Sequence, residues 1–322
     1  MFLLFGYVLR LWRELHARAT NEPVVTHADR AIASAVAGAG ASLSDHVSPS
    51  DRVSLAPPSA ASRGPVVLLA HQVRYDVRTS LRNPRARFFT FFFPIVLLVI
   101  FAGVFGHGTT TMDGVHVKLS HFYVTGILAV SIVVASYANL VISISALRES
   151  GVLKRRRATP VPPALLIAGQ AISTLVTVIF MSTILLVIGK FAYGVGMAPA
   201  AIAAIACTAV LGTLAFACIG YAVSGLIGSP DAAQPIVQAT TMPLWFLSGV
   251  FIPTANLSGT LHTVGSLFPV EHLANSLQVA SLHTSFAGAI SPGDLLALAV
   301  WGAAAAAFAA WRFSWLPSTA AA

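Results

Sequence analysis

The sequence predicts an all-α polytopic membrane protein with six transmembrane helices, an amphipathic interfacial helix before the first span and a re-entrant or interfacial helical segment before the sixth. Only 9% of the 322 residues are charged and 56% are hydrophobic, whereas a soluble domain carries about 25% charged residues. The mean hydropathy is +0.80. Several apolar runs also reach the roughly 20 residues that a helix needs to cross a bilayer.

The first 65 residues precede the expected membrane domain. Residues 1–20 place apolar residues at helical spacing beside arginines, which fits a helix on an anionic membrane surface and, as well, an unstructured end. No basic region precedes the apolar start and no small-residue cleavage site follows it, so we do not expect a signal peptide. Residues 21–65 are rich in Ala, Ser and Pro and lack aromatic residues, which predicts a flexible cytoplasmic linker.

Residues 66–87 predict an interfacial helix before the first span. Apolar residues at three- and four-residue spacing form one stripe, and a basic stripe runs beside it. The basic stripe consists of Arg74, Arg78, Arg82 and Arg85. Such a helix lies in the membrane surface with its arginines near lipid phosphates. An ordinary solvated helix face is the alternative, which we disfavour because the first apolar run begins so soon afterwards.

Six spans are expected within a membrane domain at 88–315. They cover residues 88–106, 121–146, 164–189, 199–227, 235–252 and 295–312. The first holds no charged residue, and the third and fourth lie in the charge-free runs before and after Lys190. Pro243 predicts a kink in the fifth span. The alanine run of the sixth suits close packing between helices.

The cations near span ends predict the orientation, because basic loops stay in the cytoplasm. With a cytoplasmic N-terminus, eleven cations fall inside and only Lys118 and Lys190 fall outside. The inner cations are Arg74, Arg78, Arg82, Arg85, Arg87, Arg148, Lys154, Arg155, Arg156, Arg157 and Arg312. We therefore expect a multi-pass protein of the cell (plasma) membrane with both termini, including the tail 316–322, in the cytoplasm.

The segment 253–292 is too long for a tight turn and too mixed for a full span. Its central part, SLFPVEHLANSLQVASL, keeps apolar residues at helical spacing around Glu271 and His272. A helix that dips into the outer leaflet or lies on it would use this pattern. Because ionisable residues near membrane depth often serve function, Glu271 and His272 are candidate gating residues. The alternative is that Glu271 faces water at the headgroup level.

Catalytic motifs are not expected in this chain. A P-loop requires G-x-x-x-x-G-K followed by Ser or Thr, but Phe191 follows Lys190, and Ile184 stands where the first glycine should be. No catalytic residue and no cofactor is therefore predicted. His107, His116, His121 and Asp113 gather before the second span without a recognisable zinc spacing, so no metal site is predicted. The cations are spread between apolar segments, which argues against a nucleic-acid partner.

Four motifs carry a resemblance to a known family. They are HQVRYDVRTSLRNPRARFF before the first span, RESGVLKRRRATPVPP after the second, SGVFIP at the end of the fifth, and LFPVEHL before the sixth. Together they resemble the ABC-2 type permeases, the membrane subunits of ABC exporters, and among these the daunorubicin-resistance-like drug or lipid exporters. The resemblance covers about residues 66–315. The long N-terminal segment is not typical of the family.

The resemblance implies a transporter half that works with partners. These would be a nucleotide-binding ATPase subunit that holds ATP and Mg, a second permease in a homodimer or related heterodimer, and membrane lipids. It implies ATPase-coupling residues at Arg74, Arg78, Arg82, Arg148, Glu149, Gly151, Lys154, Arg155, Arg156 and Arg157. From the residues alone, the basic loop would read as a topogenic anchor that binds lipid phosphates.

The resemblance further implies export of an amphipathic drug or lipid from the cytoplasm or inner leaflet. Candidate pathway-lining residues are Phe92, Phe93, Tyr137, Asn139, Trp245 and Phe246. Export of polysaccharide or another glycan is an alternative, as is a membrane scaffold without transport activity. A secondary transporter would need repeated halves and buried ionisable residues, and neither is visible.

Overall fold

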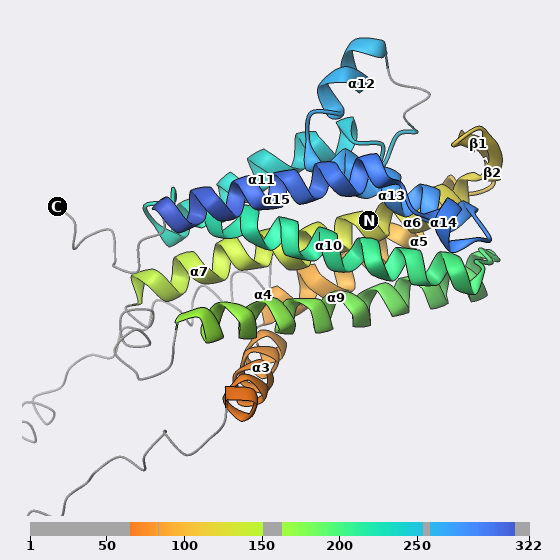
Figure 1. Cartoon of the computed structure of the whole chain (residues 1–322). Coiled ribbons are helices and arrows are strands. Elements are labelled where there is room, and N and C mark those ends of the chain that lie inside the picture. Colours follow the sequence, from red (N-terminus) through yellow and green to blue (C-terminus); the bar gives the residue numbers. More distant parts are fainter. Residues whose placement is uncertain (1–64, 83, 151–162, 254–257, 313–322) are drawn as a thin grey trace, which may run out of the picture. The chain divides into compact units, whose positions relative to one another are not determined.

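A computed structural model describes residues 65–82, 84–150, 163–253 and 258–312 (Figure 1). The predicted surface helix 1–20, nearly all of the linker, the basic loop from Gly151 to Arg157 and the tail 316–322 lie outside the described residues. Four helical stretches in the described part are long and apolar enough to cross a membrane. They are Leu119–Glu149, Ile167–Tyr193, Pro199–Ser224 and Pro292–Trp311, and Phe88–Val104 is a shorter apolar helix. The count of six spans stays a prediction.

Prolines begin many of these helices. Proline is the first residue of α3 (Pro65–Arg82), α4 (Pro84–Arg87), α9 (Pro163–Tyr193), α10 (Pro199–Ser224), α11 (Pro230–Leu247), α13 (Pro269–Leu282) and α15 (Pro292–Arg312). The first turn of a helix has no intrahelical acceptor for its N–H groups, so the missing N–H of proline costs nothing there. Proline also disfavours helix in the residue that precedes it, and Ala198, Ser229 and Phe268, which precede α10, α11 and α13, have extended backbone.

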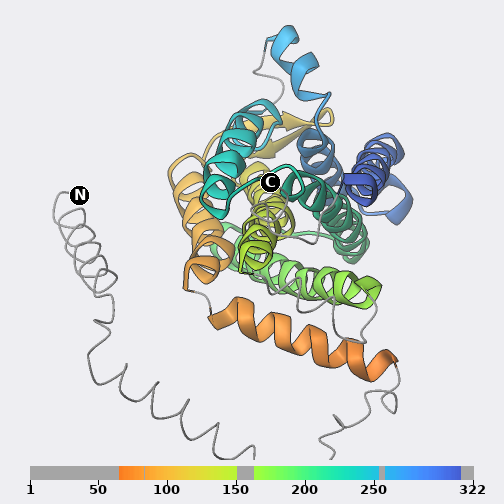
Figure 2. The same cartoon turned by 90° about the vertical axis from the view of Figure 1, so that its left-hand side faces the viewer.

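Helix α3 packs across α9, as Figure 2 shows. Gly169 of α9 allows the close approach, because a Cβ at this position would lie 2.6 Å from Cγ of Gln72. The Nε2 atom of Gln72 in turn donates to both carboxylate oxygens of Asp76, each at 2.9 Å. The outer arginines of α3 are exposed, and the position of this helix at a membrane surface stays a prediction.

The first apolar helix begins with a wide turn. The π-helical segment η3 (Phe88–Phe92) leads into α5 (Phe93–Val104), and Phe93 donates its backbone N–H to the carbonyl of Phe88. Pro94 has no N–H for the usual acceptor one turn earlier. A π turn accommodates this gap within a continuous helix. A hairpin follows, formed by β1 (Thr109–Met112) and β2 (Val115–Lys118) in antiparallel register.

The second span lies at the centre of the helices. It consists of α6 (Leu119–Val133), the π turn η4 (Val134–Ala138) and α7 (Asn139–Glu149). Nearly all of α6 is buried. Gly126 permits the tightest contact, since an added Cβ would lie 2.5 Å from the carbonyl oxygen of Val250. Helix α7 packs against α10 and α11, so the second span remains surrounded by other helices in its second half.

The outer helices pack through small residues. Helices α10 and α15 lie side by side (Figure 1), and a Cβ on Gly302 would approach Ala215 to 3.0 Å. Such close backbone contact is favourable in a membrane, where van der Waals packing replaces the hydrophobic effect between helices. Helix α11 contains Pro235 and Pro243 and is not among the four span-length apolar helices.

In the described residues between α11 and α15, the structure has three short helices. They are α12 (Gly259–Gly265), α13 (Pro269–Leu282) and α14 (Phe286–Ala289). Helix α13 packs against α6, α10 and α15, and both Leu273 and Leu277 are fully buried. Leu273 fits against Gly212 of α10, where an added Cβ would lie 2.6 Å from Cδ1 of Leu273. The segment expected to be re-entrant or interfacial therefore contains a helix whose apolar face is covered by spans.

Candidate functional site

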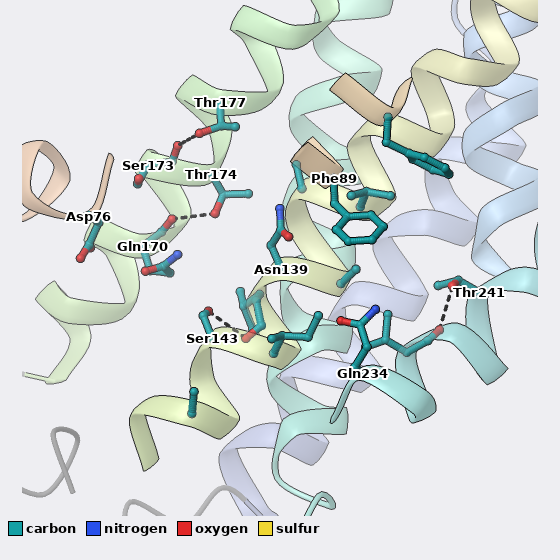
Figure 3. Close-up of a pocket in the computed structure, with 18 of the residues that line it drawn as sticks. Asp76, Phe89, Asn139, Ser143, Gln170, Ser173, Thr174, Thr177, Gln234 and Thr241 are labelled. Carbon is teal, nitrogen blue, oxygen red and sulfur yellow. Dashed lines mark hydrogen bonds between the residues drawn. The ribbon is translucent and has the colours of Figure 1, made fainter. Parts of the chain in front are cut away.

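A cavity of about 560 Å³ lies between α3, η3 with the start of α5, η4 with α7, α9 and α11 (Figure 3). Its volume is within the range of about 300–1,000 Å³ that small-molecule sites occupy. Each of these elements contributes side chains to the wall, although they are far apart in the sequence. The cavity is therefore a product of the packing of the helices and not of one local motif.

One wall of the cavity is polar and comes from α9. Gln170, Ser173, Thr174 and Thr177 line it, and positions spaced by three, four and seven residues share one face of a helix. Oγ1 of Thr174 donates to the carbonyl of Gln170 at 2.9 Å, and Oγ1 of Thr177 donates to that of Ser173 at 2.9 Å (Figure 3). These bonds point the hydroxyl hydrogens along the helix and fix the rotamers.

Polar side chains of α11 and α7 also line the cavity. Gln234, Gln238 and Thr241 line the cavity from one face of α11, and Asn139 and Ser143 line it from α7. Nδ2 of Asn139 donates to Oγ1 of Thr90 at 2.5 Å. In Figure 3 the amide of Asn139 lies on the side of α7 that faces α9, and the amide of Gln234 lies between the α7 and α11 ribbons. The polar groups therefore surround the cavity from three helices.

Aromatic side chains close the cavity at the end of α11. The rings of Phe93 and Trp245 both line it, with centroids 6.4 Å apart. Behind them, Phe251 lies 6.2 Å from Trp245 and stacks on Phe101 at 4.8 Å. Aromatic pairs at 4.5–7 Å between centroids attract each other beyond their burial, by about 0.5–1.5 kcal/mol. The aromatic part of the cavity wall, Phe93 and Trp245, therefore belongs to a larger aromatic cluster that includes Phe251 and Phe101.

The candidate lining residues fall into two groups. Phe93, Asn139 and Trp245 lie in the cavity wall. Phe92 and Phe246 are 56% and 52% exposed, and Tyr137 is buried with its hydroxyl 2.8 Å from Oγ1 of Thr240. The polar residues of α9 and α11 were missed, and their signal is visible in the sequence. It is a helical spacing of uncharged polar residues within a charge-free run, which a count of charges overlooks.

Arg148 does not lie on the surface, where a contact with a partner subunit would need it. Its side chain is buried, with only 4% of the residue exposed. Nη1 donates to the carbonyl oxygen of Ser224 at 3.1 Å, and Nη2 donates to that of Ile227. These carbonyls stand at and just beyond the C-terminus of α10, where a cation is favoured by the helix dipole. Arg148 is thus a structural link between the second span and the α10–α11 connection.

The other coupling candidates are less fully described. Arg74, Arg78 and Arg82 are exposed on α3, and Glu149 is half-buried at the end of α7. Gly151, Lys154, Arg155, Arg156 and Arg157 lie outside the described residues. The exposed arginines of α3 leave a basic surface on the opposite side of the helix from Asp76, which lines the cavity.

Glu271 belongs to a second polar cluster, at the start of α13. It is 7% exposed, and Oε1 lies 3.4 Å from Nε2 of His262. Oε2 is buried without a hydrogen-bond partner in the described part of the chain. Burial raises the pKa of the Glu271 carboxyl, a shift opposed by His262 and His272 and assisted by Asp294. The burial argues against the alternative in which Glu271 faces water.

His272 is held by a different acid. Its Nδ1 lies 2.7 Å from Oδ1 of Asp294, at the start of α15. Oδ2 of Asp294 also accepts from Nδ2 of Asn275 and Oγ of Ser291, each at 2.6 Å. The cluster ties α13 to the first turn of α15. Neighbouring Glu271 and His272 therefore serve two separate contacts, one toward α12 and one toward α15.

Histidines before the second span lie apart in the structure. Nδ1 of His116 is 3.2 Å from Oγ1 of Thr111 within the hairpin, whereas Nε2 of His121 is 2.9 Å from Oγ of Ser281. Across residues 65–82, 84–150, 163–253 and 258–312, no group of three or more His, Cys, Asp or Glu side chains is placed to hold a metal ion.

The helices and their cavity define a polytopic helical membrane protein. A family model described as ABC-2 type transporter matches residues 69–282, which include the helices α5 to α11, the cavity and α13. The match covers more than half of the chain, and the protein belongs to the ABC-2 type transporter family. The matched domain is a membrane component and not a catalytic ATPase. A search of curated proteins finds no match.

Proposed function

We propose that the chain is the permease subunit of an ATP-binding cassette exporter that moves an amphipathic drug or lipid out of the cytoplasm or inner leaflet. The observation that carries the proposal is the cavity, in which polar side chains of α7, α9 and α11 face an aromatic wall formed by Phe93 and Trp245. A binding site with apolar walls and a few placed polar groups suits a molecule of mixed polarity.

The position of α3 supports ATP-driven coupling. Tyr75, Asp76 and Thr79 of this helix line the cavity, while Arg74 and Arg78 are exposed. A nucleotide-binding subunit that pulls on the basic side of α3 would therefore shift part of the cavity wall directly. ATP and Mg would be held by that subunit, and the exposed arginines would meet acidic side chains there.

The proposal also includes how the permease assembles and in which membrane it lies. Two permeases, identical or related, would stand together in the cell membrane among its lipids, with the termini in the cytoplasm. The basic stripe of α3, with Arg74, Arg78 and Arg82 exposed, favours the cytoplasmic face, where anionic lipids attract cations. A place in the daunorubicin-resistance-like subgroup rests on the sequence motifs.

The proposal is tested by filling the cavity. Ala138 lines it, so Ala138→Phe would occupy part of its volume, whereas Ala304 is exposed on α15 and Ala304→Phe adds the same side chain away from it. With the nucleotide-binding subunit in nanodiscs, we expect Ala138→Phe to lower amphipath-stimulated ATPase activity and efflux about tenfold or more, because a filled site excludes substrate. Ala304→Phe should retain both. Equal transport by the two variants would refute the cavity as the substrate site.

A further inference from the structure

We infer that the two π turns, η3 and η4, form a hinge in the cavity wall, and that the hydrogen bond from Asn139 to Thr90 holds this hinge in the arrangement that forms the cavity. This inference rests on the proposed function, because it names the part of the wall that would move during transport. Both turns line the cavity, one hydrogen bond joins them, and the sequence of η4 also permits an ordinary α turn.

The two π turns contribute to the same cavity. Residues of both turns line it, and so does the residue that follows each turn. In each case this following residue donates its backbone N–H to the carbonyl five residues earlier. The width of a π turn therefore decides where the next lining residue lies. The lining residues are Phe89 and Phe93 at η3, and Val134, Ala135, Ala138 and Asn139 at η4.

A hydrogen bond connects the turns across the first and second spans. Nδ2 of Asn139 donates to Oγ1 of Thr90 at 2.5 Å, although the two residues are 49 positions apart. Thr90 lies in the middle of η3 and is only 3% exposed. Buried polar groups are costly when they are left without a partner, so the bond favours one relative position of the turns. Because Asn139 also closes η4, a change in that turn would displace the donor.

The two turns have different local causes. In η3 the wide turn is built into the sequence, because Pro94 removes a backbone donor. No proline lies in η4 or within one turn of it, so every N–H that an α turn needs is present. Oγ of Ser136 donates to the carbonyl of Ile132 at 2.5 Å, and such hydroxyl bonds to the preceding turn bend helices. The chain therefore permits the wide turn of η4 without requiring it.

The two halves of the second span have different neighbours. Before η4, helix α6 packs against α5, α9 and α13. After it, helix α7 packs against α10 and α11, and Arg148 bonds to the carbonyls of Ser224 and Ile227. Helices kink at π turns, and such turns are frequent at functional sites. A change in η4 would therefore move α7 relative to α6 and α9.

Helix α7 is long enough to make a small change at η4 measurable. It has 11 residues and rises about 1.5 Å per residue, so its end lies about 16 Å from η4. A rotation of about 10° at the turn would move that end by about 3 Å. Ala146 and Leu147 of α7 line the cavity, as do Gln170 and Ser173 of α9. The movement would change the separation of these two walls.

The test measures this separation with two spin labels. Ser150, at the end of α7, and Ile167, in α9, are both exposed. Ser150→Cys and Ile167→Cys carry the labels in the full-length chain, and both native cysteines are replaced by serine. The labelled chain is diluted with unlabelled chain in nanodiscs, so that pulsed electron paramagnetic resonance records distances within one chain. We expect one main distance, with at most about 10% of the chains at a second distance.

Variants of Thr90 then release the hinge. Thr90→Val keeps the branched shape and removes the acceptor oxygen, whereas Thr90→Ser keeps the oxygen. A hydrogen bond between helices in a membrane shifts an equilibrium about 3- to 15-fold. Thr90→Val should therefore raise a second population of about 5% to about 15–45%. Thr90→Ser should keep the single main distance.

Two further variants make the result specific to this bond. Thr90→Val with Asn139→Leu removes both partners and leaves no amide unpaired, so it should also raise the second population, and it carries the test where Thr90→Val alone fails to fold. Thr183→Val is the matched control. Thr183 is exposed on α9 and donates to the carbonyl of Ile179 at 2.8 Å, and it does not line the cavity. Thr183→Val should leave the distances unchanged.

The outcomes separate the two proposals. Distances that remain unchanged in Thr90→Val and in the double variant would overturn the inference, and so would a second population of equal size in Thr90→Ser or Thr183→Val. A second population already as large without these changes would also overturn it. The proposed transport does not depend on these results, because Ala138→Phe tests it through efflux. Equal efflux by Ala138→Phe and Ala304→Phe would refute the proposed function and leave the distance measurement valid.

Discussion

Replacement of Arg148 by alanine should destabilise the folded chain strongly. The guanidinium donates to the carbonyls of Ser224 and Ile227 in a site where Arg148 is 4% exposed. Hydrogen bonds that involve a charged group contribute about 1.5–3 kcal/mol each, which gives about 3–6 kcal/mol for two. Burial of the guanidinium costs the unaltered protein part of this gain, because the cation is hydrated in the unfolded chain, and the alanine variant does not have that cost. We therefore expect Arg148→Ala to lower the free energy of unfolding by about 3 kcal/mol.

The assay is thermal unfolding of the purified chain in detergent, followed by tryptophan fluorescence. At about 2–4 °C per kcal/mol for a chain of this size, Arg148→Ala should melt about 6–12 °C below the unaltered protein. Arg148→Lys keeps the charge, but a single ammonium nitrogen does not match the fork of the guanidinium, so it should recover about half of the loss.

Arg78→Ala is the matched control for this measurement, because Arg78 is exposed on α3. Surface substitutions of this kind usually change stability by about 0.5 kcal/mol or less. The reasoning would be refuted by an Arg148→Ala melting temperature within about 2 °C of the unaltered protein. It would also be refuted if Arg78→Ala destabilised the chain as much.

Two other predictions concern stability. Burial raises the pKa of Glu271 in the folded state, against the attraction of His262 and His272, so the folded chain holds this proton more tightly than the unfolded chain does. The stability that Glu271 contributes should therefore fall as the pH rises from 4.5, the usual pKa of the group, through the raised pKa. Glu271→Gln should flatten this part of a plot of melting temperature against pH. The same slope of melting temperature against pH in Glu271→Gln and in the unaltered protein would contradict this. Gly126→Ala should cost about 1–3 kcal/mol because its Cβ would lie 2.5 Å from the Val250 carbonyl, whereas Gly103→Ala, at 3.7 Å from its nearest neighbour, should melt at or above the unaltered protein.

Apolar runs were sufficient to predict the helical membrane character, because the bilayer demands a minimum length and internally satisfied backbone groups. The hairpin β1–β2 was not predicted, although its signal is present. Asp113 and Gly114 take positive φ values of 48° and 75° between alternating segments, and Asp-Gly is a preferred two-residue hairpin turn. Each strand is only four residues long, so its alternation is a weak signal beside the long apolar runs that flank it.

The cavity and the burial of Arg148 depend on long-range packing. Arg148 meets acceptors 76 and 79 residues further along the chain, and no local pattern in the sequence announces them. In the sequence it stands beside a run of cations, which suggested a shared surface role. A buried and an exposed arginine look alike in a charge count, and only the position of α10 distinguishes them.

The proposed coupling would run through helices that also line the cavity. Helix α3 lines the cavity with Asp76 and exposes Arg78 on its other side. Helix α7 lines the cavity with Ser143 and ends at Arg148, which bonds to the connection that leads into α11. Helix α11 lines the opposite wall with Gln234. In the proposed coupling, a force on the end of α7 would therefore act on the walls formed by α7 and α11 together, and removal of the Arg148 guanidinium should uncouple them even where the chain still folds.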